Sequence, residues 1–287
     1  MRPSERLSVL FLLALSAATA AWSPAPGRLL LLAGLLGATL ALARAAVRGG
    51  PAGLLRDVAV PVGVVVGTFM VLEPVIAAVN PARYDAVLAA FDDRWCSGLV
   101  EAWRGALGRP AALTDATYLV YVSFYLLPLA AFLLARRRGP EAMEAVAFPV
   151  LLGFYASYLG YALWPATGPR VAAAGEAALG GGTVAEAVRW FLRAAEATTL
   201  DAFPSGHTAL SLVAAALGAR VAPRLGPLLV AWAAAIVFST VYVHVHYLAD
   251  LLGGAVLAGL TLALAPAASR ALGRPGTRRP GAAVLPI

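Results

Sequence analysis

The sequence holds three histidines, His207, His244 and His246, and Asp250 follows the last of them by four residues. On a helix this spacing puts His246 and Asp250 on one face, so the carboxylate could bond one ring nitrogen and fix the tautomer. An imidazole oriented in this way suits nucleophilic or general-base chemistry. His244 would lie roughly 200° around the same helix from His246. We expect His244 to serve packing or a local hydrogen bond.

A second segment, 203–208, reads Phe-Pro-Ser-Gly-His-Thr and starts a predicted helix. Ser205 is expected to cap this helix, whose first amides and positive dipole end can hold an anion. Gly206 would let the backbone approach a ligand closely. We therefore predict phosphate contacts from Ser205, Gly206 and Thr208, with His207 beside them. The plain alternative is an ordinary capped helix start.

The third segment, 164–170, reads Trp-Pro-Ala-Thr-Gly-Pro-Arg and follows an apolar stretch. Arg170 comes after two helix breakers and is expected on a fixed turn. Its planar guanidinium could clamp phosphate oxygens in a bidentate manner. The alternative is that Arg170 only anchors the end of a membrane span at the interface.

A metal site is the rival reading of the histidines. Two histidines and one aspartate could ligate a metal ion, but no HExxH-type spacing accompanies them. Cys96 is the single cysteine, which excludes a cysteine metal site and an internal disulfide. We expect no metal and no other cofactor.

The composition predicts a membrane protein, because 61% of the residues are hydrophobic and only 13% are charged. A helix needs about 20 apolar residues to cross a bilayer. The net charge of +7 comes from arginine alone, in clusters between apolar runs, which favours anionic headgroups over nucleic acid as the basic partner. The eight expected spans are 6–22, 28–47, 57–79, 115–135, 143–164, 205–221, 226–246 and 248–269.

The arginine clusters also predict the orientation. With the N-terminus in the cytoplasm, most of the 22 arginines fall on the cytoplasmic side. The C-terminus is then cytoplasmic, and Arg170, His207, His246 and Asp250 all lie on the outer face. Residues 1–21 also resemble a cleavable signal peptide. We expect an uncleaved first span, since a second apolar run follows directly.

Two polar segments, 80–115 and 184–197, are expected to form amphipathic helices at the interface, and a surface cap over the bundle is the simplest role for each. Glu73 could contact a substrate headgroup, or merely face the interface. Tyr118, Tyr121 and Tyr125 recur on one helical face. Tyr118 could line a headgroup pocket, although an aromatic interfacial stripe is the commoner arrangement.

Together the three motifs resemble those of the phosphatidic acid phosphatase type 2 superfamily, particularly its branch of inositol phosphorylceramide synthase-like bacterial proteins. The resemblance spans about residues 60–270. It implies that His207 protonates the leaving oxygen and that His246 is the nucleophile that takes up the phosphoryl group. Asp250 would orient His246.

Two positions depart from the broad family pattern. Leu163 stands where the pattern has a lysine before the arginine of the first motif, and Thr240 stands where it has an arginine. These departures remove two phosphate-binding cations and fit the inositol phosphotransferase-like branch better. Arg193 could supply a replacement charge, or Ser205, Thr208 and Arg170 could suffice.

The sequence thus predicts an all-α polytopic bundle of about eight spans, with a catalytic core of five or six helices. Residues 1–56 would form N-terminal spans, 57–270 the catalytic domain and 271–287 a disordered tail. We expect a phosphatase or phosphotransferase of the cell membrane whose partners are a lipid phosphate and the membrane itself, not nucleic acid. An inositol phosphotransferase and an inactive membrane scaffold are the alternatives. The lipid, the acceptor and the oligomeric state are left open.

Overall fold

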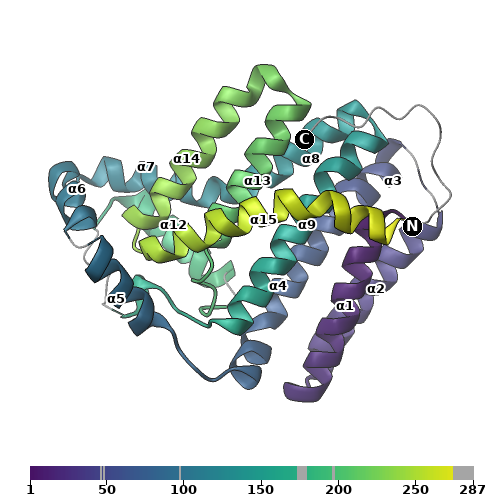
Figure 1. The fold of residues 1–287 in the computed structure, drawn as a ribbon, viewed down its shortest axis with the longest axis horizontal. Coiled ribbons are helices and arrows are strands. Elements are labelled where there is room, and N and C mark those ends of the chain that lie inside the picture. Colours follow the sequence, from purple (N-terminus) through teal and green to yellow (C-terminus); the bar gives the residue numbers. More distant parts are fainter. Residues whose placement is uncertain (46, 48, 97, 173–179, 196–197, 274–287) are drawn as a thin grey trace.

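The computed structural model describes residues 1–45, 47, 49–96, 98–172, 180–195 and 198–273. This part of the chain is helical throughout its regular elements and contains no strand, which confirms the predicted fold class (Figure 1). The longer helices are α1 (Pro3–Trp22), α2 (Pro26–Ala45), α4 (Val60–Val79), α5 (Asp85–Trp95), α6 (Leu99–Leu107), α7 (Ala111–Val122), α8 (Leu126–Arg138), α9 (Pro140–Leu163), α12 (Thr183–Ala195), α13 (Gly206–Val221), α14 (Gly226–Tyr242) and α15 (Leu248–Leu272).

Short elements join some of these helices. They are α3 (Gly50–Leu54), η1 (Leu55–Ala59), η2 (Ser123–Tyr125), α10 (Pro169–Ala172) and η3 (Pro223–Leu225). Through them, α3 to α4 form one continuous helical run, and α7 to α8 form another. Within the described residues, seven such runs are long and apolar enough to cross a membrane: Pro3–Trp22, Pro26–Ala45, Gly50–Val79, Ala111–Arg138, Pro140–Leu163, Pro223–Tyr242 and Leu248–Leu272.

The sixth predicted span, 205–221, is not among these runs; it is α13, which has only 16 residues. At 1.5 Å per residue it is about 24 Å long, shorter than the hydrocarbon layer of a typical bilayer. It is the central helix of the bundle and contacts α8, α9, α14 and α15. Small residues make this close packing possible, since a Cβ added at Gly218 would lie 2.9 Å from the side chain of Leu229. The expected helix is therefore present, although its length does not identify it as a span.

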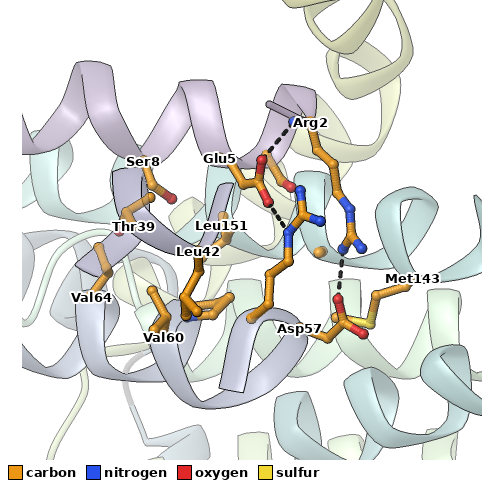
Figure 2. A pocket seen from close by; sticks show the side chains of 14 residues that line it. Arg2, Glu5, Ser8, Thr39, Leu42, Asp57, Val60, Val64, Met143 and Leu151 are labelled. Atoms are coloured by element: carbon orange, nitrogen blue, oxygen red, sulfur yellow. Dashed lines mark hydrogen bonds and ion pairs between the residues drawn. The ribbon is translucent and has the colours of Figure 1, made fainter. Parts of the chain in front are cut away.

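One end of the bundle is tied together by ion pairs between arginines and acidic residues (Figure 2). Arg56 Nε lies 2.6 Å from Glu5 Oε1, and Arg2 lies 2.7 Å from Asp57 Oδ1. Arg136 approaches the other oxygen of Asp57 at 3.4 Å. These contacts join the starts of α1 and of the α3–α4 run to the end of α8. Arginines from three of the clusters that predicted the orientation, Arg2, Arg56 and Arg136, thus lie at one end of the molecule.

The first helix, α1, is packed onto the bundle along its length. At the ion-pair end, Ser4 donates to the carboxylate of Glu144 on α9 through both its backbone N–H and its hydroxyl. Further along, the hydroxyls of Ser8 and Tyr155 lie 2.8 Å apart, and the ring of Phe11 stacks on Tyr155 with centroids 4.2 Å apart. The contacts place α1 and α2 side by side at the lower right of Figure 1.

The polar segment 80–115 contains two separate helices, α5 and α6, at the left edge of Figure 1. Helix α5 is amphipathic: Phe91 and Trp95 are 37% and 69% exposed, whereas Leu88 is buried against the loops that carry the sequence motifs. The other polar segment forms α12, which buries Val188 and Leu192 against α7.

Candidate active site

The three motifs meet at the end of the bundle opposite the ion pairs. α9 ends there at Leu163, α14 ends at Tyr242, and α13 and α15 begin there. In Figure 1, α15 runs from this end at the left to the N-terminus of α1 at the right. Loops 164–170, 198–205 and 243–247 therefore lie together, although they are far apart in the sequence.

His246 is the centre of the site. Its Nδ1 lies 3.2 Å from Asp250 Oδ2, and its Nε2 lies 3.3 Å from His207 Nδ1. The same Asp250 oxygen accepts a hydrogen bond from the backbone N–H of Tyr247 at 2.9 Å. If Nδ1–H of His246 donates to Asp250, Nε2 carries a lone pair and accepts from His207. The contact predicted between His246 and Asp250 is thus present, and His207 joins it.

The predicted helix through His244 and His246 is wrong, because α14 ends at Tyr242. The backbone carbonyl of Thr240 accepts hydrogen bonds from the N–H groups of Val245 and His246, which folds the chain back in a tight turn. His244 adopts a positive φ of 58° within that turn. His246 reaches Asp250 because the turn delivers it to the first turn of α15. The four-residue spacing therefore predicted the correct pair of residues, although His246 and Asp250 do not lie on one continuous helix.

The His207 ring is held between two aromatic rings from the α7–α8 run. Tyr121 stacks on it with centroids 4.7 Å apart, and Phe124 lies 4.4 Å away. Tyr121 is the tyrosine of the predicted stripe that reaches the histidines. Tyr118 instead packs beneath Arg189 of α12, whose guanidinium lies 5.3 Å from its ring centroid. A helical spacing alone did not distinguish these two tyrosines.

Ser205 caps α13 as predicted: its Oγ accepts a hydrogen bond from the Thr208 N–H at 3.2 Å. The Ser205 N–H donates to the backbone carbonyl of Asp250, which fixes the starts of α13 and α15 to each other. Gly206 lies against the hydroxyl of Tyr161, where a Cβ would collide. The Thr208 side chain is buried, and its Cβ faces Gly254 of α15. Thr208 therefore points into the helix packing around the site.

The turn that carries Arg170 packs directly on the His246 loop. Gly168 has a φ of 78° and lies against the backbone carbonyl of Val245, so both conformation and space require glycine. The Ala202 N–H donates to the carbonyl of Ala166, which ties this turn to the segment before α13. Arg170 is half-buried at the end of the turn.

The environment of His246 favours its neutral form. Burial of the ring, together with the positive charge of Arg170, lowers the pKa of His246 to about 3. The imidazole is therefore uncharged at neutral pH and has a lone pair for nucleophilic attack. The charge of Arg170 thus contributes to the electrostatics of the His246 ring.

Two aspartates of α5 hold the motif loops, and the sequence reading missed both. Asp85 accepts hydrogen bonds from the N–H groups of Thr167 and Gly168 at 2.9 Å. Asp92 accepts from the N–H groups of Leu248 and Ala249, the first two residues of α15, at 2.7 and 2.9 Å. The sequence signal for this role was that the two aspartates are seven residues apart on a predicted amphipathic helix. Nothing in the sequence showed which backbone amides they would bind.

The remaining predicted contacts lie at the rim of this end. Glu73 accepts a hydrogen bond from the Thr199 N–H at 2.6 Å, which fixes α4 to the segment before α13. At the two positions where the broad family pattern has a cation, Leu163 is exposed, whereas Thr240 is fully buried and its hydroxyl donates to the Val237 carbonyl. Arg193 is exposed on α12. In the part of the chain that the structure describes, no three His, Cys, Asp or Glu side chains are grouped so that they could hold a metal ion.

The fold and the site define a multi-pass helical membrane protein with paired histidines at one end of its bundle. The chain belongs to the PAP2 superfamily, whose family model matches residues 86–264. Members of this superfamily are phosphatases and phosphotransferases, which places the chain among lipid-phosphate enzymes of that type. The match includes Arg170, His207, His246 and Asp250 and begins after Glu73. No curated protein and no solved structure matches the chain.

Proposed function

We propose that this protein transfers the phosphoryl group of a membrane lipid phosphate through a covalent phosphohistidine on His246. The observation that carries the proposal is the continuous chain of contacts from Asp250 through His246 to His207, at 3.2 and 3.3 Å. Such a displacement needs a carboxylate that orients the nucleophile, a neutral imidazole as the nucleophile and a second imidazole as the general acid.

In the first step His246 Nε2 attacks phosphorus, so that a P–N bond forms while the P–O bond to the lipid alcohol breaks. His207, which takes up a proton as the anionic phosphate binds beside it, donates that proton to the departing oxygen and becomes neutral. Asp250 stabilises the positive charge that develops on the His246 ring. His207 Nδ1 and His246 Nε2 are 3.3 Å apart, which leaves no room for a phosphoryl group between these two atoms. One ring must therefore turn as the substrate enters.

In the second step an acceptor hydroxyl attacks the phosphohistidine, and its proton passes to His207 as the P–N bond breaks. Arg170 supplies positive charge to the phosphoryl oxygens, and the first amides of α13, at Gly206 and His207, supply hydrogen bonds. Ser205 contributes by its hydroxyl and by capping this helix start. Thr208 acts in this scheme by packing α13 onto α15.

The active site is proposed to face the outside of the cell. The ion-paired arginines Arg2, Arg56 and Arg136 lie at the opposite end of the bundle, and arginine-rich ends favour the cytoplasm. Both termini would then be cytoplasmic. A lipid phosphate would reach the site from the outer leaflet.

The acceptor distinguishes two versions of this function. Water as acceptor makes the protein a phosphatase. If the donor is instead an inositol phospholipid, His246 takes up its phosphoinositol group as the lipid alcohol leaves, and attack by a second lipid hydroxyl makes the protein an inositol phosphotransferase that forms an inositol phospholipid or sphingolipid. Leu163 and Thr240, where the broad pattern has cations, favour the second version. A catalytically inactive scaffold would keep the fold without forming the phosphohistidine.

The proposal is tested with detergent-purified protein given phosphatidic acid in the presence of EDTA, with His246→Ala as the paired variant. We expect metal-independent phosphate release that falls by at least about 10³-fold in the variant. Rapid acid-free quenching with ³²P-labelled substrate should trap label on wild-type protein only.

If phosphate release is absent, the same assay is repeated with an inositol phospholipid as donor and a lipid alcohol as acceptor. Formation of a new inositol lipid would assign the phosphotransferase. A folded wild-type protein that neither turns over nor becomes labelled in either assay is an inactive scaffold, and the enzyme proposal is then wrong.

A further inference from the structure

A large apolar cavity leads from the side of the bundle to His207. Its volume is about 370 Å³, within the roughly 300–1,000 Å³ range of small-molecule sites. Its walls come from α4, from the α7–α8 run and from α9, and its polar end is formed by Asp201, Gly206 and His207. All other lining side chains except tyrosine hydroxyls are apolar.

The cavity opens on a face of the molecule that lies in the membrane. Val66 and Met70 line it from α4 and are 50% and 54% exposed, and Tyr125 lines it from the facing side and is 45% exposed. All three belong to helical runs that are long and apolar enough to span a bilayer. Hydrocarbon is therefore the medium in contact with the opening.

The inner end of the cavity is continuous with the catalytic centre. Phe124 lines the cavity and also packs against the His207 ring at 4.4 Å. Tyr161 lines it and places its hydroxyl against Gly206 at the start of α13. A molecule with an apolar chain in this cavity would thus hold its polar end at the proposed phosphate site.

We infer that the cavity between α4 and α8 binds a hydrocarbon chain of the lipid phosphate and that α4 sets which chains are accepted. This inference rests on the proposed function, because it names the substrate as a long-chain lipid and not a soluble phosphate ester. The family match begins at residue 86, whereas α4 ends at Val79. The α4 wall is therefore a feature of this chain beyond the matched region.

The kinetic test fills the cavity from both walls. Val66→Trp on α4 and Leu129→Trp on α8 place a bulky ring in it, and Val79→Trp and Leu133→Trp are matched controls at exposed positions of the same helices outside its lining. We expect kcat/KM for long-chain phosphatidic acid to fall about tenfold or more in the filled variants only. Turnover of a short-chain, water-soluble analogue should match wild type. Equal loss on both substrates, or no loss, overturns the inference.

A binding test separates this inference from the proposed function. The His246→Ala variant in nanodiscs is photolysed with phosphatidic acid that carries a diazirine in its acyl chain. We expect label on peptides of α4 and α8 that excess unlabelled phosphatidic acid removes, and loss of that label in Val66→Trp. Label that spreads over the lipid-facing helices without competition overturns the cavity assignment. If wild type lacks turnover while competed label persists, the proposed function fails and the cavity assignment stands.

Discussion

The Asp250 carboxylate lies 3.2 Å from His246 Nδ1, and the oxygen that makes this contact also accepts the N–H of Tyr247. The second bond holds the carboxylate in place within the first turn of α15. Asp250 is therefore positioned by the backbone before it positions the imidazole. Its role in the proposed reaction is to fix the tautomer that leaves the lone pair on Nε2.

Asp250→Asn tests this role with almost no change in shape. One oxygen, Oδ2, makes both contacts, so the amide has two possible orientations. With its carbonyl oxygen in this place both hydrogen bonds are kept but the negative charge that stabilises the His246 imidazolium is lost, and with its NH₂ group there Nδ1 must accept, which gives the wrong tautomer. We expect kcat to fall about 10²- to 10⁴-fold with KM little changed, together with less trapped phosphohistidine. The thermal midpoint of the purified variant checks that the fold is kept. Wild-type kcat in a folded variant would remove Asp250 from the mechanism.

The pH dependence follows from the pKa of His246, which burial and Arg170 lower to about 3 from an ordinary value of about 6.5. Neutral His246 persists well below pH 6.5, so protonation of the nucleophile should not reduce kcat/KM between pH 7 and about pH 5. Arg170→Gln removes the nearby positive charge and raises this pKa. The acid limb of the kcat/KM profile should then move to higher pH, while exposed Arg83→Gln leaves it in place. An unmoved limb would show that Arg170 does not act on His246.

The same pKa has a consequence for stability. Below about pH 6.5 the unfolded chain binds a proton at His246 that the folded chain does not bind until about pH 3. Falling pH through this window therefore destabilises the fold, and the residue contributes no pH dependence above it. Thermal midpoints measured from pH 7 down to pH 5 should fall less in His246→Gln than in wild type.

The sequence predicted what depends on local pattern. Apolar runs predicted the helices, and Ser205 predicted a helix cap. The arginine clusters predicted one end of the bundle, where the ion pairs Arg56–Glu5 and Arg2–Asp57 lie. It missed what depends on loop conformation. Because a non-helical turn after Tyr242 carries His246, no helical periodicity could place it.

Contacts between distant segments were likewise beyond the sequence. The ring that stacks on His207 is Tyr121 and not Tyr118, and that choice depends on how the α7–α8 run is rotated against α13. The backbone amides that Asp85 and Asp92 bind are supplied by loops 82 and 156 residues away along the chain. Such pairings are set by tertiary packing, since the sequence does not distinguish these two aspartates from any other exposed acidic residue that could bind a backbone amide.

Asp92 is predicted to position the site from outside it. Asp92→Ala removes the acceptor for the first two N–H groups of α15, at a cost of about 1–2 kcal/mol as for the loss of a helix cap. Because His246 and Asp250 flank this helix start, kcat should fall along with stability. Exposed Asp93→Ala on the same helix is the matched control and should change neither. A fall in stability at unchanged kcat would make Asp92 a structural cap alone.

The ion pairs at the opposite end should separate stability from catalysis. Arg56 and Glu5 are 2.6 Å apart with side chains only 8% and 11% exposed, so Glu5→Gln leaves a largely buried guanidinium without its counter-charge. We expect a loss of about 1–3 kcal/mol, seen as a lower thermal midpoint, and unchanged kcat, because the histidines lie at the other end of the bundle. Exposed Glu141→Gln on α9 is the control. Adding Arg56→Met to Glu5→Gln should recover part of the loss, since it removes the unpaired charge. If the double variant were as unstable as the sum of both single changes, the two residues would contribute independently and the pair would not be the source of the effect.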